Sequence, residues 1–177
     1  MKNKFVITFI AALIVCISSV TFAATFSDVP ADHWAYDDIM HLADEGIISP
    51  YEDGTFLGDR NATRYEVAVM VANLYSKKTH KPIKMGLNPF SDLPPNHWAA
   101  KAVTTLFETG IEEGCGDGTF SGNHNITKGE LRTMINNLFR VTGIAAKMKD
   151  NPNNASETLT RYELAVTLNK VYKVMFN

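Results

Sequence analysis

The sequence predicts an all-α protein made of helix–loop–helix repeats, and three observations support this prediction. The tetrapeptide TRYE occurs at 63–66 and again at 160–163, with the variant TKGE at 127–130. Residues 26–66 align without a gap with residues 90–130, and 18 of the 41 aligned positions are identical, so this stretch is an internal repeat. Each tetrapeptide is followed by apolar residues at helical spacing.

The first 23 residues have the organisation of a signal peptide. Lys2 and Lys4 form a short positive head, an apolar run follows, and residues 21–23 end in a small residue suited to cleavage. The apolar run is short for a membrane span, although an anchor that is kept in the mature protein remains the alternative. We therefore expect residues 24–177 to form a single mature domain, with no membrane span after cleavage.

Each full repeat is expected to begin with an amphipathic helix. Apolar or small residues recur there at intervals of four, three and four, and the two sets are Ala35, Ile39, Leu42, Gly46 and Ala99, Val103, Leu106, Gly110. The glycine that closes each set stands where helices commonly end in a left-handed residue. The sequence DGTF follows at 53–56 and 117–120; Asp-Gly favours a turn there, and Phe56 and Phe120 are expected to fill the core.

The second helix of each repeat is expected to begin at the tetrapeptide. Three threonine–glutamate pairs have capping-box spacing, Thr63 with Glu66, Thr127 with Glu130 and Thr160 with Glu163. In a capping box the threonine hydroxyl accepts from an amide of the first turn, and the glutamate accepts from the amide of the threonine. Loss of such a threonine costs about 1 kcal/mol of helix stability.

The basic residue at the second position of the tetrapeptide is not explained by capping. Arg64, Lys128 and Arg161 lie in the first turn, where the helix dipole mildly disfavours a positive charge. A cation placed against this preference three times calls for another role.

These elements divide the mature chain into repeats. The first is expected at 26–75, a basic linker at 76–89, the second repeat at 90–139 and a truncated third at 140–177. Gly143 precedes Thr160 by the interval that separates Gly46 from Thr63, but the third unit has neither an HWA nor a DGTF sequence. Its leading helix is therefore expected to be missing.

Composition excludes several function classes. The mature part keeps 15 of the 17 basic residues against all 19 acidic ones, so it lacks the positive charge typical of nucleic-acid binding. Cleavage leaves Cys115 as the single cysteine, and no metal-binding, phosphate-binding or nucleophile motif is present. We expect no catalytic residue, no metal and no cofactor, and hence a protein that is not an enzyme.

The combined pattern resembles the S-layer homology domain. F-x-D-V-P-x-x-H-W-A, G-I-I, D-G-T-F and T-R-x-E all occur, over 26–75 and 90–139, with a truncated version at 143–175. This resemblance implies a pseudo-threefold helical bundle, here with an incomplete third unit, in secreted bacterial proteins held non-covalently at the cell wall or in the periplasmic envelope. It also implies that grooves between units bind wall glycan, either peptidoglycan or a pyruvylated secondary polymer.

The resemblance assigns the glycan-binding residues. They are the basic residues Arg64, Lys128 and Arg161, the aromatic residues Trp34 and Trp98, the acidic residues Asp28 and Asp92, and the turn residues Asp53, Gly54, Asp117 and Gly118. A guanidinium can hold a carboxylate with two hydrogen bonds, and an indole can cover a sugar face. Core packing is the alternative for the tryptophans, and helix capping is the alternative for Asp28 and Asp92.

Because the third unit lacks its aromatic residue, we expect one dependable site, centred on Arg64, and at most two. The alternative function is structural: another chain would complete the third unit, so that the protein forms a homo-oligomer through an unpaired apolar helix face.

Overall fold

A computed structural model of the protein describes residues 26–149 and 151–177. The predicted signal peptide, 1–23, lies outside these residues. The helices are α1 (Tyr36–Asp44), α2 (Arg64–Thr79), α3 (Ala100–Glu108), α4 (Lys128–Val141) and α5 (Arg161–Phe176), with a 3₁₀ turn η1 (Pro152–Asn154) before α5. The described residues contain no β-strand and only three isolated bridges, Asn61 to Thr160, Thr63 to Asn125 and Thr127 to Thr158. The all-α prediction is therefore confirmed.

The predicted helix boundaries follow the local chemistry. All three capping boxes are formed, at the starts of α2, α4 and α5. Gly46 and Gly110 have φ values of 69° and 68° just after α1 and α3, in the left-handed region that glycine adopts without a Cβ penalty. The side chains of Phe56 and Phe120 are fully buried, as predicted.

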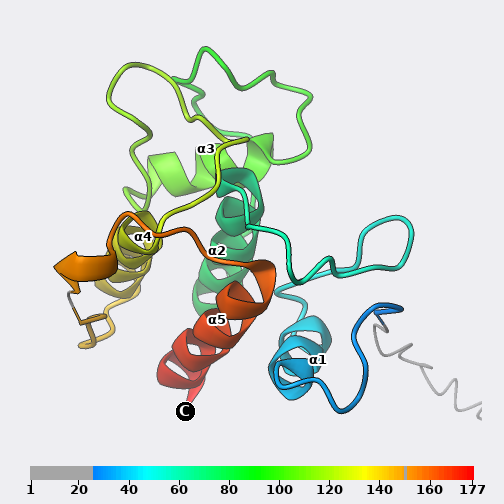
Figure 1. Cartoon of the computed structure of the whole chain (residues 1–177). Helices are drawn as coiled ribbons and strands as arrows, with labels where there is room; N and C mark the ends of the chain where they lie inside the picture. Colours follow the sequence, from blue (N-terminus) through cyan, green and yellow to red (C-terminus); the bar gives the residue numbers. More distant parts are fainter. Residues whose placement is uncertain (1–25, 150) are drawn as a thin grey trace, which may run out of the picture.

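Two helix pairs make the largest contacts in the bundle (Figure 1). α3 packs across α2, and α1 packs against α5. The first pair joins the first repeat to the second, whereas the second pair joins the C-terminal helix back to the N-terminal one. The ends of the described chain are therefore tied together by packing, and α2 contacts both α4 and α5.

The third unit has an extended segment where the full repeats have a leading helix. Met148 N donates to Asn136 Oδ1 over 2.8 Å, and Gly129 N donates to Ala155 O over 2.9 Å, so residues 144–149 and 151–157 lie along α4. Ile144, Ala146 and Met148 are partly buried against the core. The loss of the helix is thus compensated within the chain. The pseudo-threefold symmetry and the repeat boundaries remain predictions.

Part of the predicted linker is bonded to the bundle. Lys84 N donates to Thr105 Oγ1 over 3.2 Å and Gly86 N to Thr104 Oγ1 over 3.1 Å, which fixes this stretch along α3. Residues 76–79 belong to α2. In the described parts of the chain, no helix combines the length and the apolar composition that crossing a bilayer requires.

Candidate functional site

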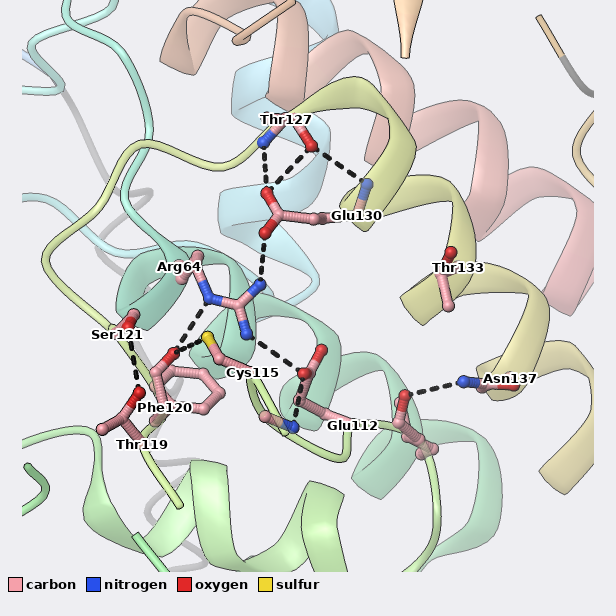
Figure 2. A network of polar contacts seen from close by, with 12 residues as sticks. Arg64, Glu112, Cys115, Thr119, Phe120, Ser121, Thr127, Glu130, Thr133 and Asn137 are labelled. Atoms are coloured by element: carbon pink, nitrogen blue, oxygen red, sulfur yellow. Dashed lines mark hydrogen bonds and ion pairs between the residues drawn. The ribbon is translucent and has the colours of Figure 1, made fainter. Parts of the chain in front are cut away.

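Arg64 connects the first repeat to the second (Figure 2). Its Nε donates to Phe120 O over 3.0 Å, and its terminal nitrogens reach Glu130 at 2.9 Å and Glu112 at 3.1 Å. Its guanidinium carbon lies 5.0 Å from the centre of the Phe120 ring. Only 5% of the side chain is exposed, so its donors are directed at protein partners. Glu130 is the capping-box glutamate of the next repeat.

Arg161 makes the equivalent connection from the third unit to the first. Its Nε donates to Phe56 O over 2.7 Å, and Nη1 lies 3.3 Å from Oε1 of Glu66. The guanidinium carbon lies 4.7 Å from the centres of both the Phe56 and Tyr51 rings. Lys128, at the same position in the second repeat, instead pairs with the exposed Glu157 at 2.7 Å. Its point charge has no fork with which to bridge a carbonyl and a carboxylate.

These contacts give the cation of the tetrapeptide a structural role. Each arginine neutralises the glutamate that caps the neighbouring second helix, and this attraction outweighs the unfavourable dipole of its own helix. Burial alone would raise the pKa of Glu66, but hydrogen bonds from Thr63 and Tyr51 and the charge of Arg161 lower it. Glu66 is therefore held ionised between repeats.

Both tryptophans are exposed, which excludes core packing. Trp34 is 64% exposed and Trp98 is 63% exposed. A tyrosine of the neighbouring unit supports each HW pair: Tyr162 lies 4.1 Å from His33 and Tyr65 lies 4.2 Å from His97, between ring centroids. The tetrapeptide tyrosine is thus a packing partner for the aromatic pair of the next unit.

The second repeat lacks this tyrosine where the third unit lacks its HW pair. A Cβ at Gly129 would lie 2.8 Å from Ala155 O, because the segment that replaces the helix passes over this position. The glycine of TKGE and the missing HWA of the third unit are therefore structurally linked. Both features are visible in the sequence, but only the contacts show that one depends on the other.

Asp28 and Asp92 hold the DGTF turns and do not cap helices. Asp28 accepts from the amides of Phe56 and Leu57 over 2.7 and 2.8 Å, and Asp92 makes the same two bonds to the second turn. The N-cap of α1 is Ala35, which has no side-chain cap. The capping alternative for these aspartates is therefore wrong.

Replacement of Asp28 by alanine should lower the free energy of unfolding by about 2–3 kcal/mol, because two amides lose a charged acceptor. Asp28→Asn should lose less, since its amide oxygen still accepts. Urea unfolding of both variants measures the difference, with the exposed Asp32→Ala as a control. Equal stability of Asp28→Ala and the unchanged protein would contradict this role for the carboxylate.

The aspartates of the two turns bond locally. Asp53 Oδ1 accepts from the amide and the hydroxyl of Thr55, and Asp117 bonds Thr119 in the same way. Gly54 and Gly118 follow with φ values of 80° and 83°. Each turn therefore supplies its own side-chain acceptor. In Asp53, Oδ1 accepts both bonds from Thr55, and Oδ2 accepts neither.

Two grooves combine residues from different units. The Trp98 groove, with a volume of about 910 Å³, is lined by Trp98, Arg161, the loop 47–53 and the side of α2 that carries Glu66, Val69, Met70 and Asn73. The Trp34 groove, of about 360 Å³, is lined by Trp34, Lys128, the exposed side of α5, and Met148, Lys149, Asn151 and Asn154. In each, the second helix of one unit lies between a tryptophan from one neighbour and a basic residue from the other.

The structure thus unites some of the predicted site residues and separates others. Trp98, Arg161 and Asp53 line one groove, and Trp34 and Lys128 line the other. Arg64, Gly54, Asp28, Asp92, Asp117 and Gly118 line neither of the two.

Sequence reasoning missed Tyr51, Arg60 and Lys149. Tyr51 and Arg60 bond Glu66 inside the Trp98 groove, where burial and the hydrogen bond to Glu66 raise the pKa of Tyr51 to about 12. None of these residue types recurs at its position in the second repeat, so the repeat pattern gave no signal for them.

Comparison with known proteins identifies the class. Residues 25–68 and 89–131 match the S-layer homology domain. The chain is 29% identical over 167 residues to Outer membrane protein SlpA of Deinococcus radiodurans, and 30% identical over 150 residues to S-layer protein sap of Bacillus anthracis, each covering 81% of the chain. It is 49% identical over 65 residues, or 35% of the chain, to Outer membrane protein alpha of Thermotoga maritima.

The protein is therefore a member of the S-layer homology domain family. It spans only 14%, 18% and 16% of these three relatives, respectively. The likeness thus concerns this module and not the rest of those proteins.

Proposed function

We propose that this protein binds bacterial cell-wall glycan non-covalently, in the Trp98 and Trp34 grooves, and acts as a secreted envelope-anchoring or accessory protein. The observation that carries the proposal is that each tryptophan is nearly two-thirds exposed at a groove that also contains a basic residue. An exposed indole next to a charge suits a ligand with an apolar sugar face and polar groups at its edge. The family match and the S-layer and outer membrane relatives support an envelope location.

The structural context favours two grooves over one site centred on Arg64. Arg64 is buried among Phe120, Glu112 and Glu130. The third unit, which would supply the tryptophan of a groove at this position, has none. Arg161 is equally bonded, but it lines the Trp98 groove together with an aromatic residue. We therefore assign glycan contact first to the tryptophans, and to Arg161 and Lys128 as charges at the groove walls.

Two contacts argue against the self-assembly alternative. α5 packs against α1, and residues 144–149 and 151–157 lie along the face of α4 that would receive a further helix. We propose no second function.

Sedimentation with purified wall sacculi tests the proposal. Trp98→Ala and Trp34→Ala should each weaken binding about tenfold, equivalent to 1.4 kcal/mol, and the double variant should bind more weakly than either. Leu87→Ala is the control, because Leu87 is 68% exposed and lines neither groove. Unchanged pelleting of the double variant would refute the proposal.

The nature of the polymer is tested by removing the secondary polymer from the sacculi. Binding that survives this treatment identifies peptidoglycan as the ligand, whereas binding that disappears identifies the pyruvylated secondary polymer.

A further inference from the structure

We infer that the two grooves accept groups of opposite charge: the Trp34 groove takes a saccharide that bears a carboxylate, and the Trp98 groove takes one that bears an ammonium group. This inference rests on the proposed function, since it assigns ligand classes to the same grooves. It comes from residues in which the two grooves differ, although both are built from a second helix, a tryptophan and a basic residue.

The loop at the edge of each groove carries opposite charges at the same position. Glu52 precedes the capping threonine of α2 by 11 residues, and Lys149 precedes the capping threonine of α5 by the same number. Both side chains are exposed, and each lines its own groove. A ligand that occupies equivalent positions in the two grooves therefore meets a carboxylate in one and an ammonium group in the other.

Inside the Trp98 groove the cations already have partners. Arg60 and Arg161 both pair with Glu66, the latter at 3.3 Å, and Tyr51 donates to the same carboxylate. The arginine charges are thus partly balanced by a buried glutamate. Glu52 and Asp53 add two further negative charges at the exposed edge, so an approaching ligand meets a net negative wall.

The Trp34 groove has the reverse balance. Among the described residues that line it, Lys128, Arg132 and Lys149 are positive and Glu163 alone is negative. Glu163 accepts from Thr160 N over 2.9 Å as part of the capping box. Lys128 is paired with Glu157, and Arg132 also has a partner, so Lys149 is the positive charge that the exposed edge of this groove presents to a ligand. This edge therefore attracts anionic groups.

Charges at an open groove act through water, so the expected selectivity is modest. Unit charges about 4 Å apart interact by about 1 kcal/mol in water and by more near a protein surface, and salt screens them. A preference of about fivefold in Kd is therefore expected at low salt, and it should shrink as the ionic strength rises.

The two tryptophans allow each groove to be measured separately. The protein contains two tryptophans, one at each groove, so two indole N–H signals in the NMR spectrum report on the two sites. Signal assignment uses Trp34→Phe. Three probes are titrated at pH 6 and low salt: glucuronic acid as the carboxylate, glucosamine as the ammonium ion and N-acetylglucosamine as the neutral sugar.

Glucuronic acid should bind about fivefold more tightly at the Trp34 signal than at the Trp98 signal, and glucosamine should show the reverse order. Lys149→Glu should remove the preference at Trp34, and Glu52→Lys should remove it at Trp98. Lys147→Glu is the matched control, because it makes the same charge change at an exposed residue of the same segment that does not line the groove.

The outcomes separate the two proposals. Equal responses of both signals to all three sugars would overturn the charge assignment while leaving glycan binding intact. Response to none of the sugars would overturn the charge assignment too, and sacculus sedimentation would then decide the proposed function on its own. Loss of the preference in Lys147→Glu as well would show that net charge, and not the groove position, is responsible, and would also overturn it.

Discussion

Arg161→Met should lower the free energy of unfolding by about 3 kcal/mol. Removing one partner of a buried ion pair typically costs about 3–5 kcal/mol, because the other charge is left without its counterion. Glu66 keeps Arg60 and Tyr51 as partners, which places the loss at the lower end. The Phe56 carbonyl also loses a donor at 2.7 Å, and methionine restores only part of the packing against its ring. Urea unfolding measures the effect.

The matched control is Lys128→Met, which alters the same tetrapeptide position in the second repeat. Lys128 pairs with an exposed glutamate, so its loss should leave the unfolding midpoint nearly unchanged. Arg161→Met with the same midpoint as the control would contradict the role of Arg161 as a connection between units. Weaker glycan binding by an arginine variant is therefore evidence about the groove only if that variant is shown to remain folded.

Phe56→Ala should lower the free energy of unfolding by about 3–5 kcal/mol, the cost of truncating a fully buried phenylalanine. The ring lies 5.3 Å from that of Phe26 and 5.7 Å from that of Tyr162, and the Arg161 guanidinium lies against it. The truncation thus removes packing from the first and third units at once. Chemical denaturation and thermal unfolding both measure the loss.

The neighbouring residue provides the control. Leu57 is 41% exposed and has a φ of 54°, a value that glycine adopts without strain. Leu57→Gly should therefore change stability by less than about 1 kcal/mol, because relief at this angle offsets the added freedom of the unfolded chain. A loss as large as that of Phe56→Ala would show that the turn, and not the buried ring, carries the stability.

Local elements were predictable because their signals are local. The capping boxes need only two residues three positions apart, and all three formed. The left-handed glycines after α1 and α3, and the burial of Phe56 and Phe120, follow from similarly short patterns. The all-α class follows from these elements together.

The candidate site was only partly predictable because it is made from three units. The sequence identified Trp34 and Trp98 as repeated residues, but not whether they face the core or solvent. In the structure both are exposed, next to tyrosines of other units. Likewise Asp28 could have capped a nearby helix, but its partners lie 28 and 29 residues away. No local rule distinguishes these outcomes.

The sequence by itself determined where the second helix of each unit begins, where α1 and α3 end and that two repeats are complete, because capping, turn formation and helical periodicity act over a few residues. Only the tertiary structure decided which units meet. It joined Arg64 to Glu130 and Arg161 to Glu66, and it covered α4 with an extended segment in place of a helix. The physical reason is that these contacts balance charge and burial between residues far apart in the chain, which short sequence patterns do not encode.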